Sequence, residues 1–258
     1  MQVIHQPAVA DMFYPADPER LHDWMQQHLV TSADPSHPPR MLIVPHAGYR
    51  FSGDIAAQGY QLLTKGIFKR VVVLSPAHRV FVQGIAVPTR WDAEATPLGN
   101  ILLDKPAIES LLALPEVIAA TEAHRQEHAI EVQLPFLQHQ LGDFKLIPII
   151  VGVSQPESVA NALDLLVDDE TLVVVSTDLS HYLSQDIARQ QDDDTIRQIL
   201  QFHENLSGDQ ACGCYALNGA LHWAHQQQLN IQLLAKCTSG DTCSDKSRVV
   251  GYAAFALY

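Results

Sequence analysis

Basic residues are scarce in this sequence. It has 16 Lys and Arg against 29 Asp and Glu, which gives a formal net charge of −13 at pH 7. Non-specific binding to nucleic acid needs basic patches that neutralise phosphates, so this charge argues against a nucleic-acid partner. The same excess of negative charge disfavours docking to an anionic membrane surface.

Long apolar runs and secretion signals are also missing. No segment approaches the ~18 apolar residues that a membrane-spanning helix needs. Residues 1–10 lack the basic stretch followed by an apolar stretch that marks a secretion signal. Four cysteines in 258 residues are too few for a disulfide scaffold. We therefore expect a cytoplasmic protein with reduced thiols.

No Gly/Ser/Pro-rich linker, internal repeat or low-complexity segment divides the chain, so we expect a single domain over residues 1–258. Apolar, β-branched runs predict buried strands that alternate with segments of helical pattern. The strands are expected at 41–44, 71–75, 84–88, 146–151, 171–176, 231–237 and 249–257. The helices are expected at 18–29, 53–63, 104–114, 127–141, 155–167, 185–203 and 208–227, with Pro135 interrupting the fourth. The alternation predicts an α/β fold, a three-layer α/β/α sandwich around a mostly parallel, mixed sheet.

Two of the predicted central strands end in the same way. The run from Met41 breaks at Pro45 and is followed by His46, and the run from Val71 breaks at Pro76 and is followed by His78. The carboxyl ends of strands in an open α/β sheet face its ligand crevice. Either histidine alone is more often a hydrogen-bonded structural residue. Two imidazoles at two strand ends support the hypothesis of a metal site.

A third strand end, after 171–176, carries Asp178 and His181. Asp178 could cap the next helix and leave His181 on its first turn, which is a structural role. Alternatively, His181 faces the crevice as a general acid or base, a role that suits an imidazole pKa near neutrality. In that hypothesis Asp178 orients His181 from three positions earlier on one face of the helical turn.

Cys212 is expected to open the helix over 208–227, where the helix dipole favours a thiolate that could bind a metal or act as a nucleophile. A small residue packed under the helix is the simpler interpretation of this stretch alone. Cys237 and Cys243 are expected to be structural or surface thiols. If Cys212 is a thiolate, peroxide should oxidise it before either of them.

The stretch His124-Arg-Gln-Glu127-His128 matches the H-x-x-E-H pattern of inverzincin zinc peptidases. That chemistry needs both histidines and the glutamate on one continuous helix. A helix that begins near Glu127 would leave His124 in the preceding loop, exposed to solvent. The zinc-peptidase hypothesis therefore has little support.

Motifs in order along nearly the whole chain resemble those of the Memo family. The matching segments are Pro7-Ala-Val-Ala, Met12-Phe-Tyr-Pro15, Pro45-His-Ala-Gly-Tyr with Phe51-Ser-Gly53, Ser75-Pro-Ala-His78, Glu127-His-Ala-Ile-Glu-Val-Gln-Leu-Pro-Phe-Leu137, Ser176-Thr-Asp-Leu-Ser-His181, Ala211-Cys-Gly213, Thr238-Ser-Gly-Asp241 and Asp245-Lys-Ser-Arg-Val-Val-Gly-Tyr-Ala-Ala254. The resemblance implies a fold like that of class III extradiol dioxygenases of the LigB type, which use non-haem iron(II).

The resemblance also implies a set of site residues. The family's two metal-binding histidines and one cysteine fall on His46, His78 and Cys212, and its further pocket residues fall on Asp178, His181 and His128. Iron(II) is the metal expected first, copper is an alternative and zinc suits the site less. Arg79 stands where many relatives have a second histidine, and a cysteine replaces the carboxylate that is the third iron ligand of the dioxygenases.

Two functions follow from the resemblance. The first is a metal-dependent oxidoreductase in which His181, oriented by Asp178, moves protons. The alternative is a non-catalytic protein that binds a peptide or small anionic ligand in the dioxygenase-like pocket. Bacterial members of the family are associated with a radical S-adenosylmethionine enzyme and an AMMECR-type protein, which are the expected partners. The substrate cannot be read from the sequence.

Overall fold

Four parallel strands form the centre of the sheet. In the computed structural model, which describes residues 2–30, 34 and 36–258, they lie in the order β2 (Met41–Val44), β9 (Thr171–Ser176), β3 (Arg70–Pro76) and β8 (Lys145–Val151). Every residue of β2 and β9 is buried. A strand covered on both faces has no solvent side, which explains the uninterrupted apolar runs in the sequence.

Antiparallel strands extend the sheet at both edges. On one side β12 (Val249–Leu257) runs antiparallel to β2, and it also pairs with β11 (Ile231–Thr238) and β10 (His181–Leu183). On the other side β4 (Ile85–Val87) runs antiparallel to β8 and carries β7 (Val117–Ala119). The sheet is therefore mixed, as the sequence predicted, and its late strands pair in antiparallel fashion.

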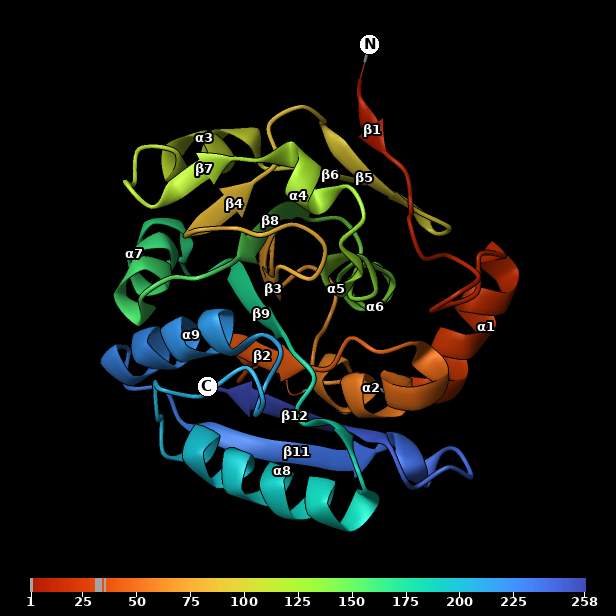
Figure 1. Ribbon diagram of the computed structural model, residues 1–258. Coiled ribbons are helices and arrows are strands. Elements are labelled where there is room, and N and C mark those ends of the chain that lie inside the picture. The colour runs from red at the N-terminus through yellow and green to blue at the C-terminus, as the bar shows by residue number, and fades with distance from the viewer. Residues whose placement is uncertain (1, 31–33, 35) are drawn as a thin grey trace.

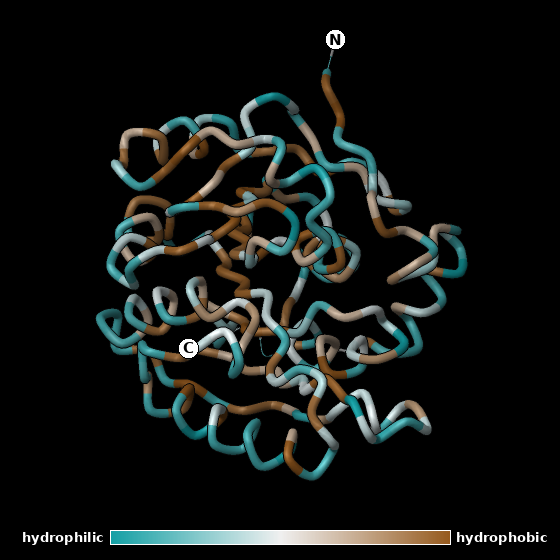
Figure 2. Tube along the Cα trace, viewed as in Figure 1, coloured by the Kyte–Doolittle hydropathy of each residue, from teal (hydrophilic) through white to brown (hydrophobic). Residues whose placement is uncertain are grey.

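Helices cover both faces of this sheet, which gives three α/β/α layers (Figure 1). On one face α7 (Pro156–Leu166) and α9 (Cys214–Gln226) pack together, while α8 (Gln185–Leu200) covers β11 and β12. The other face carries α2 (Asp54–Tyr60), α5 (His128–Glu131) and α6 (Leu134–Leu141), with α1 (Pro18–His28) outside α6. The apolar segments of Figure 2 concentrate in the strands between the two helical layers. No helix in the described part of the chain is long and apolar enough to cross a membrane.

Two predicted helices differ from the structure. The segment expected as one helix over 127–141 forms α5 and α6, and Pro135 occupies the first turn of α6, where its missing N–H costs no helical hydrogen bond. The helix expected from residue 208 begins at Cys214, with Gly213 as its N-cap. Cys212 therefore lies in the turn before the helix and does not open it.

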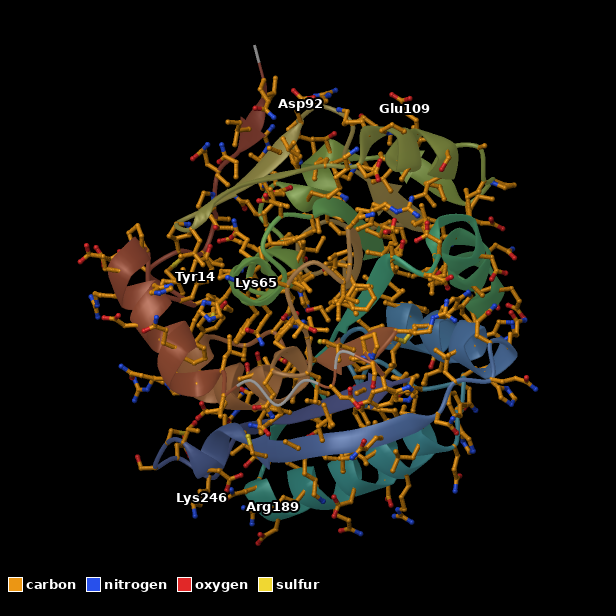
Figure 3. The ribbon with its side chains drawn as sticks, turned by 180° about the vertical axis from the view of Figure 1, so that it is seen from behind. Tyr14, Lys65, Asp92, Glu109, Arg189 and Lys246 are labelled. Carbon is orange, nitrogen blue, oxygen red and sulfur yellow. The ribbon has the colours of Figure 1, made fainter. Side chains whose placement is uncertain are left out.

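The N-terminal segment is tied to the body by a buried carboxylate, Glu131 at the end of α5. Its oxygens accept the backbone N–H of Ala8 at 2.7 Å and of Val9 at 3.0 Å, and the hydroxyl of Tyr14 at 2.6 Å. Tyr14 lies close to α1 when the molecule is seen from behind (Figure 3). The preceding residue, Phe13, packs against His128, with the two ring centres 4.9 Å apart.

A small second sheet forms beside this segment. It consists of β1 (Ile4–His5), β5 (Ala93–Thr96) and β6 (Gly99–Leu102), in that order. Two short helices, α3 (Lys105–Leu111) and α4 (Thr121–His124), complete this end of the molecule. The sheet places the N-terminal strand close to the loops that follow β3 and β4.

Candidate metal centre

His46 leaves the end of β2 with its ring held in one tautomer. The hydroxyl of Ser176 donates to the carbonyl of Ala129 at 2.7 Å, so toward the ring nitrogen its oxygen acts as an acceptor. The Nδ1–H of His46 donates to that oxygen at 3.0 Å, and the amide of Gln133 donates to it at 2.8 Å. Since Nδ1 carries the proton, Nε2 keeps its lone pair free for a metal.

The orientation of the Gln133 amide is fixed in turn by Tyr60. The Tyr60 hydroxyl donates to Gln133 Oε1 at 2.9 Å, which directs the amide nitrogen toward Ser176 and the carbonyl of Pro45. All of these side chains are buried. This network extends from Tyr60 at the end of α2, through Gln133, the residue before α6, and Ser176 of β9, to the ring of His46. The sequence does not predict Tyr60, Gln133 or Ser176 as site residues.

His78, after β3, is held in the same way by Glu127. Glu127 accepts the backbone N–H of His78 at 2.7 Å and its ring Nδ1–H at 2.8 Å. Burial opposes ionisation of this carboxyl, but the hydrogen bond and charge of His78 lower the pKa of Glu127 to about 2. The Nε2 of His78 again remains free. Such carboxylate–histidine pairs orient metal ligands in many proteins.

Cys212 approaches both histidines from the turn before α9. Its Sγ lies 3.3 Å from His46 Nε2 and accepts the backbone N–H of Asp178 at 3.3 Å. Gly213 makes this approach possible, since a Cβ there would lie 2.9 Å from the Cβ of Thr177. Burial, together with the Asp178 carboxylate, raises the pKa of Cys212 to about 12. The helix dipole therefore does not by itself produce a thiolate, contrary to the expectation from sequence.

These three side chains converge although the sequence separates them widely. One ligand atom from each of His46, His78 and Cys212 lies within 4.8 Å of the other two. Ligand atoms around one tetrahedral ion stand roughly 3.5 Å apart at bond lengths of ~2.0–2.3 Å. Small movements would bring all three to one ion. The donor set, two free imidazole nitrogens and a thiol, fits a soft or borderline transition metal.

His128 adds a third imidazole to the cluster. Its ring lies 4.9 Å from that of His78 and 5.4 Å from that of His46. Its Nδ1 is buried without a hydrogen-bond partner among the described residues, 3.4 Å from Glu127 Oε1. Burial lowers the pKa of His128 to about 4 and of His46 to about 3, so both rings are neutral near pH 7.

Asp178 and His181 reach the cluster in different ways. The Asp178 carboxylate accepts the backbone N–H of His46 at 2.8 Å, and burial raises its pKa. His181 starts strand β10 and donates from Nδ1 to the carbonyl of Leu179 at 2.8 Å. The expected helical turn shared by Asp178 and His181 is therefore wrong, and Asp178 orients His46 instead. His181, His78 and Cys212 line one pocket of about 520 Å³.

The position of His124 also differs from the prediction. It is only 4% exposed, ends α4 and donates from Nε2 to the carbonyl of Ala86 at 3.0 Å. The expectation that it is an exposed loop residue is wrong, because α4 packs it against β4. The structure agrees with the interpretation that one continuous helix does not span the motif, since α4 ends at His124 and α5 begins at His128. From sequence Glu127 is expected only to start a helix, but its hydrogen bonds to His78 make it part of the site.

Comparison with known proteins identifies the family. The family model described as Memo-like protein matches residues 5–256. The chain belongs to the Memo family. Among its relatives, a MEMO1 family protein of Archaeoglobus fulgidus is 34% identical, covering 97% of this chain and 98% of the relative. Another from Sulfolobus acidocaldarius is 35% identical with the same coverage.

A solved structure supports the fold of this Memo-family chain. The crystal structure of an uncharacterized protein from Escherichia coli K12 matches with a TM-score of 0.52 at 14% sequence identity. The match covers 85% of this chain and all of that one. The likeness shows that the two chains share a fold, and it carries no information on the chemistry of the site.

Proposed function

We propose that this Memo-family protein is a metal-dependent oxidoreductase whose ion is held by His46, His78 and Cys212. The observation that carries the proposal is the shared orientation of the two rings. Ser176 binds Nδ1 of His46 and Glu127 binds Nδ1 of His78, so Nε2 stays free on both rings, and one ligand atom of each ring lies within 4.8 Å of Cys212 Sγ. Histidines with such a second hydrogen bond are preorganised for metal binding.

We propose iron(II) as the ion, with copper as the alternative and zinc less suited, although the donor set alone does not separate iron from copper. Imidazole and thiolate bind all three metals, but an ion with only three protein ligands retains open coordination positions. When bound, a redox-active ion would supply electron transfer to or from a substrate or dioxygen at this site. Two carboxylates, Asp178 and Glu127, stand next to the ligands and offset the positive charge of the ion.

His181 is the residue proposed to move protons. Its Nδ1–H is engaged by the carbonyl of Leu179, which leaves Nε2 able to accept a proton. It lines the same pocket as His78 and Cys212, so a molecule in that pocket can reach all three. His128 is half-buried, with its ring close to those of Phe13, His46 and His78, and we propose that its neutral ring packs against the two metal-binding histidines and keeps them in place beside the pocket.

The zinc-peptidase alternative is disfavoured by the same contacts. Glu127 would have to act as the general base on a water. Its two oxygens instead accept hydrogen bonds from the backbone and ring of His78 and from the backbone of Ala129. His124 is directed toward β4 by its bond to Ala86.

Anaerobic reconstitution with iron(II), followed by addition of nitric oxide, tests the proposal. The wild type should bind one iron and form a paramagnetic nitrosyl complex, because an oxidoreductase needs an open position. His46→Ala and Cys212→Ser should lose the iron, whereas His181→Ala should keep it. An exposed histidine, His203, supplies the control, and His203→Ala should behave as the wild type.

The outcome that supports the binding-protein alternative is equally defined. If the wild type binds one iron but forms no nitrosyl complex, the iron has no open coordination position. That result would support the binding-protein alternative. If His181→Ala empties the site while His78→Ala leaves it filled, the roles of these two histidines are reversed.

A further inference from the structure

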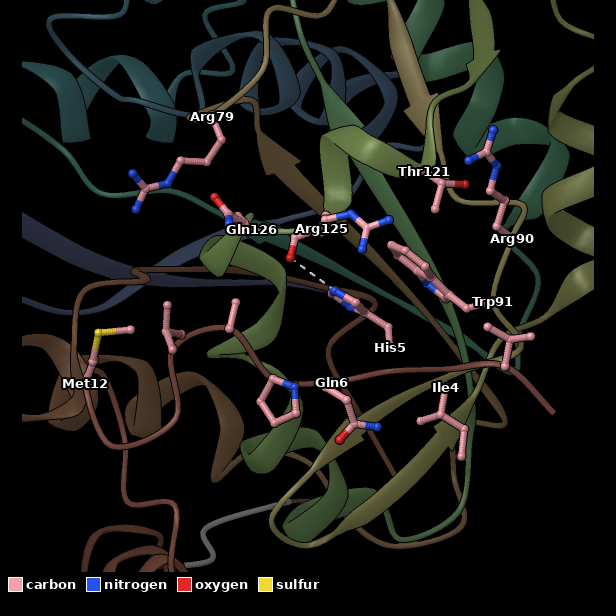
Figure 4. Close-up of a pocket in the computed structure, with 14 residues that line it drawn as sticks. Ile4, His5, Gln6, Met12, Arg79, Arg90, Trp91, Thr121, Arg125 and Gln126 are labelled. Atoms are coloured by element: carbon pink, nitrogen blue, oxygen red, sulfur yellow. Dashed lines mark hydrogen bonds between the residues drawn. The ribbon is translucent and has the colours of Figure 1, made fainter.

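A second pocket, of about 690 Å³, lies at the N-terminal end of the molecule (Figure 4). It shares no lining residue with the pocket at the metal centre. Its walls come from residues 3–12, from the loops after β3 and β4, and from the region of α4. Its volume falls within the range of small-molecule sites, roughly 300–1,000 Å³.

The charge of this pocket is opposite to that of the protein. Arg79, Arg90 and Arg125 line it, and no Asp or Glu of the described residues does so. The chain as a whole has 29 acidic and only 16 basic residues. A concave surface with three guanidinium groups and no carboxylate attracts anions, and guanidinium binds carboxylate and phosphate in a paired geometry.

The nearby carboxylates are already engaged. Glu94 is hydrogen bonded to His5 at 2.7 Å, and Glu131 holds the backbone of the N-terminal segment. The Glu122 carboxylate accepts hydrogen bonds from Arg125 Nε at 2.7 Å and Nη2 at 3.0 Å, and it lies 3.8 Å from Arg90 Nη1. Within the described residues Arg79 has no ion pair. Because the Glu122 pairs are well exposed, they contribute little, and a ligand anion can compete for both arginines.

The arginines are distributed along the pocket rather than gathered at one point. Figure 4 shows Arg79 at one end above Met12, Arg90 at the other end beyond Trp91, and Arg125 between them, extended toward Thr121. The wall between the ends is mixed: the His5 ring stacks on Trp91 at 4.2 Å beside Pro7, and the polar side chains of Gln6, Thr121 and Gln126 also line it. Guanidinium groups at both ends of one pocket fit a ligand with two negatively charged ends.

We propose that this pocket binds an organic dianion, two carboxylate or phosphate groups joined by a short chain. Arg79 binds one end, and Arg125 with Arg90 binds the other. The proposal goes beyond the oxidoreductase function and does not depend on it, because the site contains none of the metal ligands. The protein freed of metal and chelator is therefore suitable for its test.

Isothermal titration at low ionic strength with adipate, against hexanoate as the monoanion of equal length, tests the proposal. Adipate should bind one to one and at least about tenfold more tightly than hexanoate. Arg79→Gln and Arg125→Gln should each weaken binding by about 5–10-fold, and added salt should weaken it further. Titration with 5-phosphonopentanoate shows whether one end prefers a phosphate-like group.

Two control variants locate the site. Arg20 is exposed and outside the pocket, so Arg20→Gln makes the same change in net charge and should bind adipate as the wild type does. Cys212→Ser alters the metal centre and should also leave adipate binding unchanged. Equal binding of adipate and hexanoate would overturn the proposal. It would also be overturned if Arg20→Gln weakens binding as much as Arg79→Gln, or if Cys212→Ser abolishes it.

Discussion

Glu127 accepts two hydrogen bonds from His78, one from the backbone N–H at 2.7 Å and one from ring Nδ1 at 2.8 Å. The carboxylate is almost completely buried, with a side-chain exposure of 1%. A single buried charge therefore fixes both the position of His78 and the nitrogen that faces Cys212. The motif that contains Glu127 is suggestive of a zinc peptidase in sequence, but in the structure it supports a different histidine.

The hydrogen bond between Glu127 and His78 allows a prediction for a variant that removes only the negative charge of Glu127. Glu127→Gln keeps the shape of the side chain, but its amide is a weaker acceptor for the Nδ1–H of His78. We expect metal affinity to fall by about 10–100-fold, as for other partners that orient metal ligands. Competition with a chromogenic chelator measures it. The exposed Glu157→Gln is the matched control, and an unchanged affinity in Glu127→Gln would show that His78 needs no such support.

Replacement of His124 should affect stability rather than metal binding. The ring is buried against β4 and donates to the carbonyl of Ala86. His124→Ala removes that bond and leaves a void, at a cost of about 1–3 kcal/mol in the free energy of unfolding. Urea unfolding measures the loss, with the exposed His203→Ala as control. Loss of metal stoichiometry in a folded His124→Ala protein would revive the zinc-peptidase hypothesis.

The structure reverses the expected order of cysteine oxidation in metal-free protein. Burial raises the pKa of both Cys212 and Cys237 to about 12, so neither thiol forms the reactive thiolate near neutral pH. Cys243 lies in a partly exposed turn near the start of β12. Peroxide treatment followed by peptide mass mapping should find Cys243 modified first. Preferential oxidation of Cys212 would mean that the thiol is ionised without a metal.

Metal binding should release a proton from Cys212. With a pKa of about 12 the free thiol is protonated at pH 7–9, whereas a metal binds the thiolate. Each unit rise in pH should therefore increase the apparent affinity by about tenfold over this range. Calorimetry in buffers of different ionisation enthalpy counts the protons. If the wild type binds the metal without releasing a proton, Cys212 does not bind it as a thiolate.

The sequence predicts the central strands, the mixed sheet and the helices that cover it. Buried strands and amphipathic helices each leave a characteristic pattern of apolar residues. His46 and His78 are identifiable for a related reason, since each follows a strand end at a proline. Ser176, Gln133 and Glu127 are not, because their roles depend on which atoms they face after folding. Asp178 shows the same limit: its position after β9 is evident, but its bond to His46 depends on the adjacent pairing of β2 and β9.

X-ray absorption spectroscopy of the iron(II)-loaded protein tests the metal centre most directly. The account predicts one sulfur at ~2.3 Å and two imidazole nitrogens at ~2.0–2.1 Å, with the remaining positions filled by light atoms. The His181→Ala protein, which is expected to keep its iron, should show the same sulfur and the same two imidazole nitrogens. A wild-type spectrum without sulfur in the first coordination shell would contradict the account.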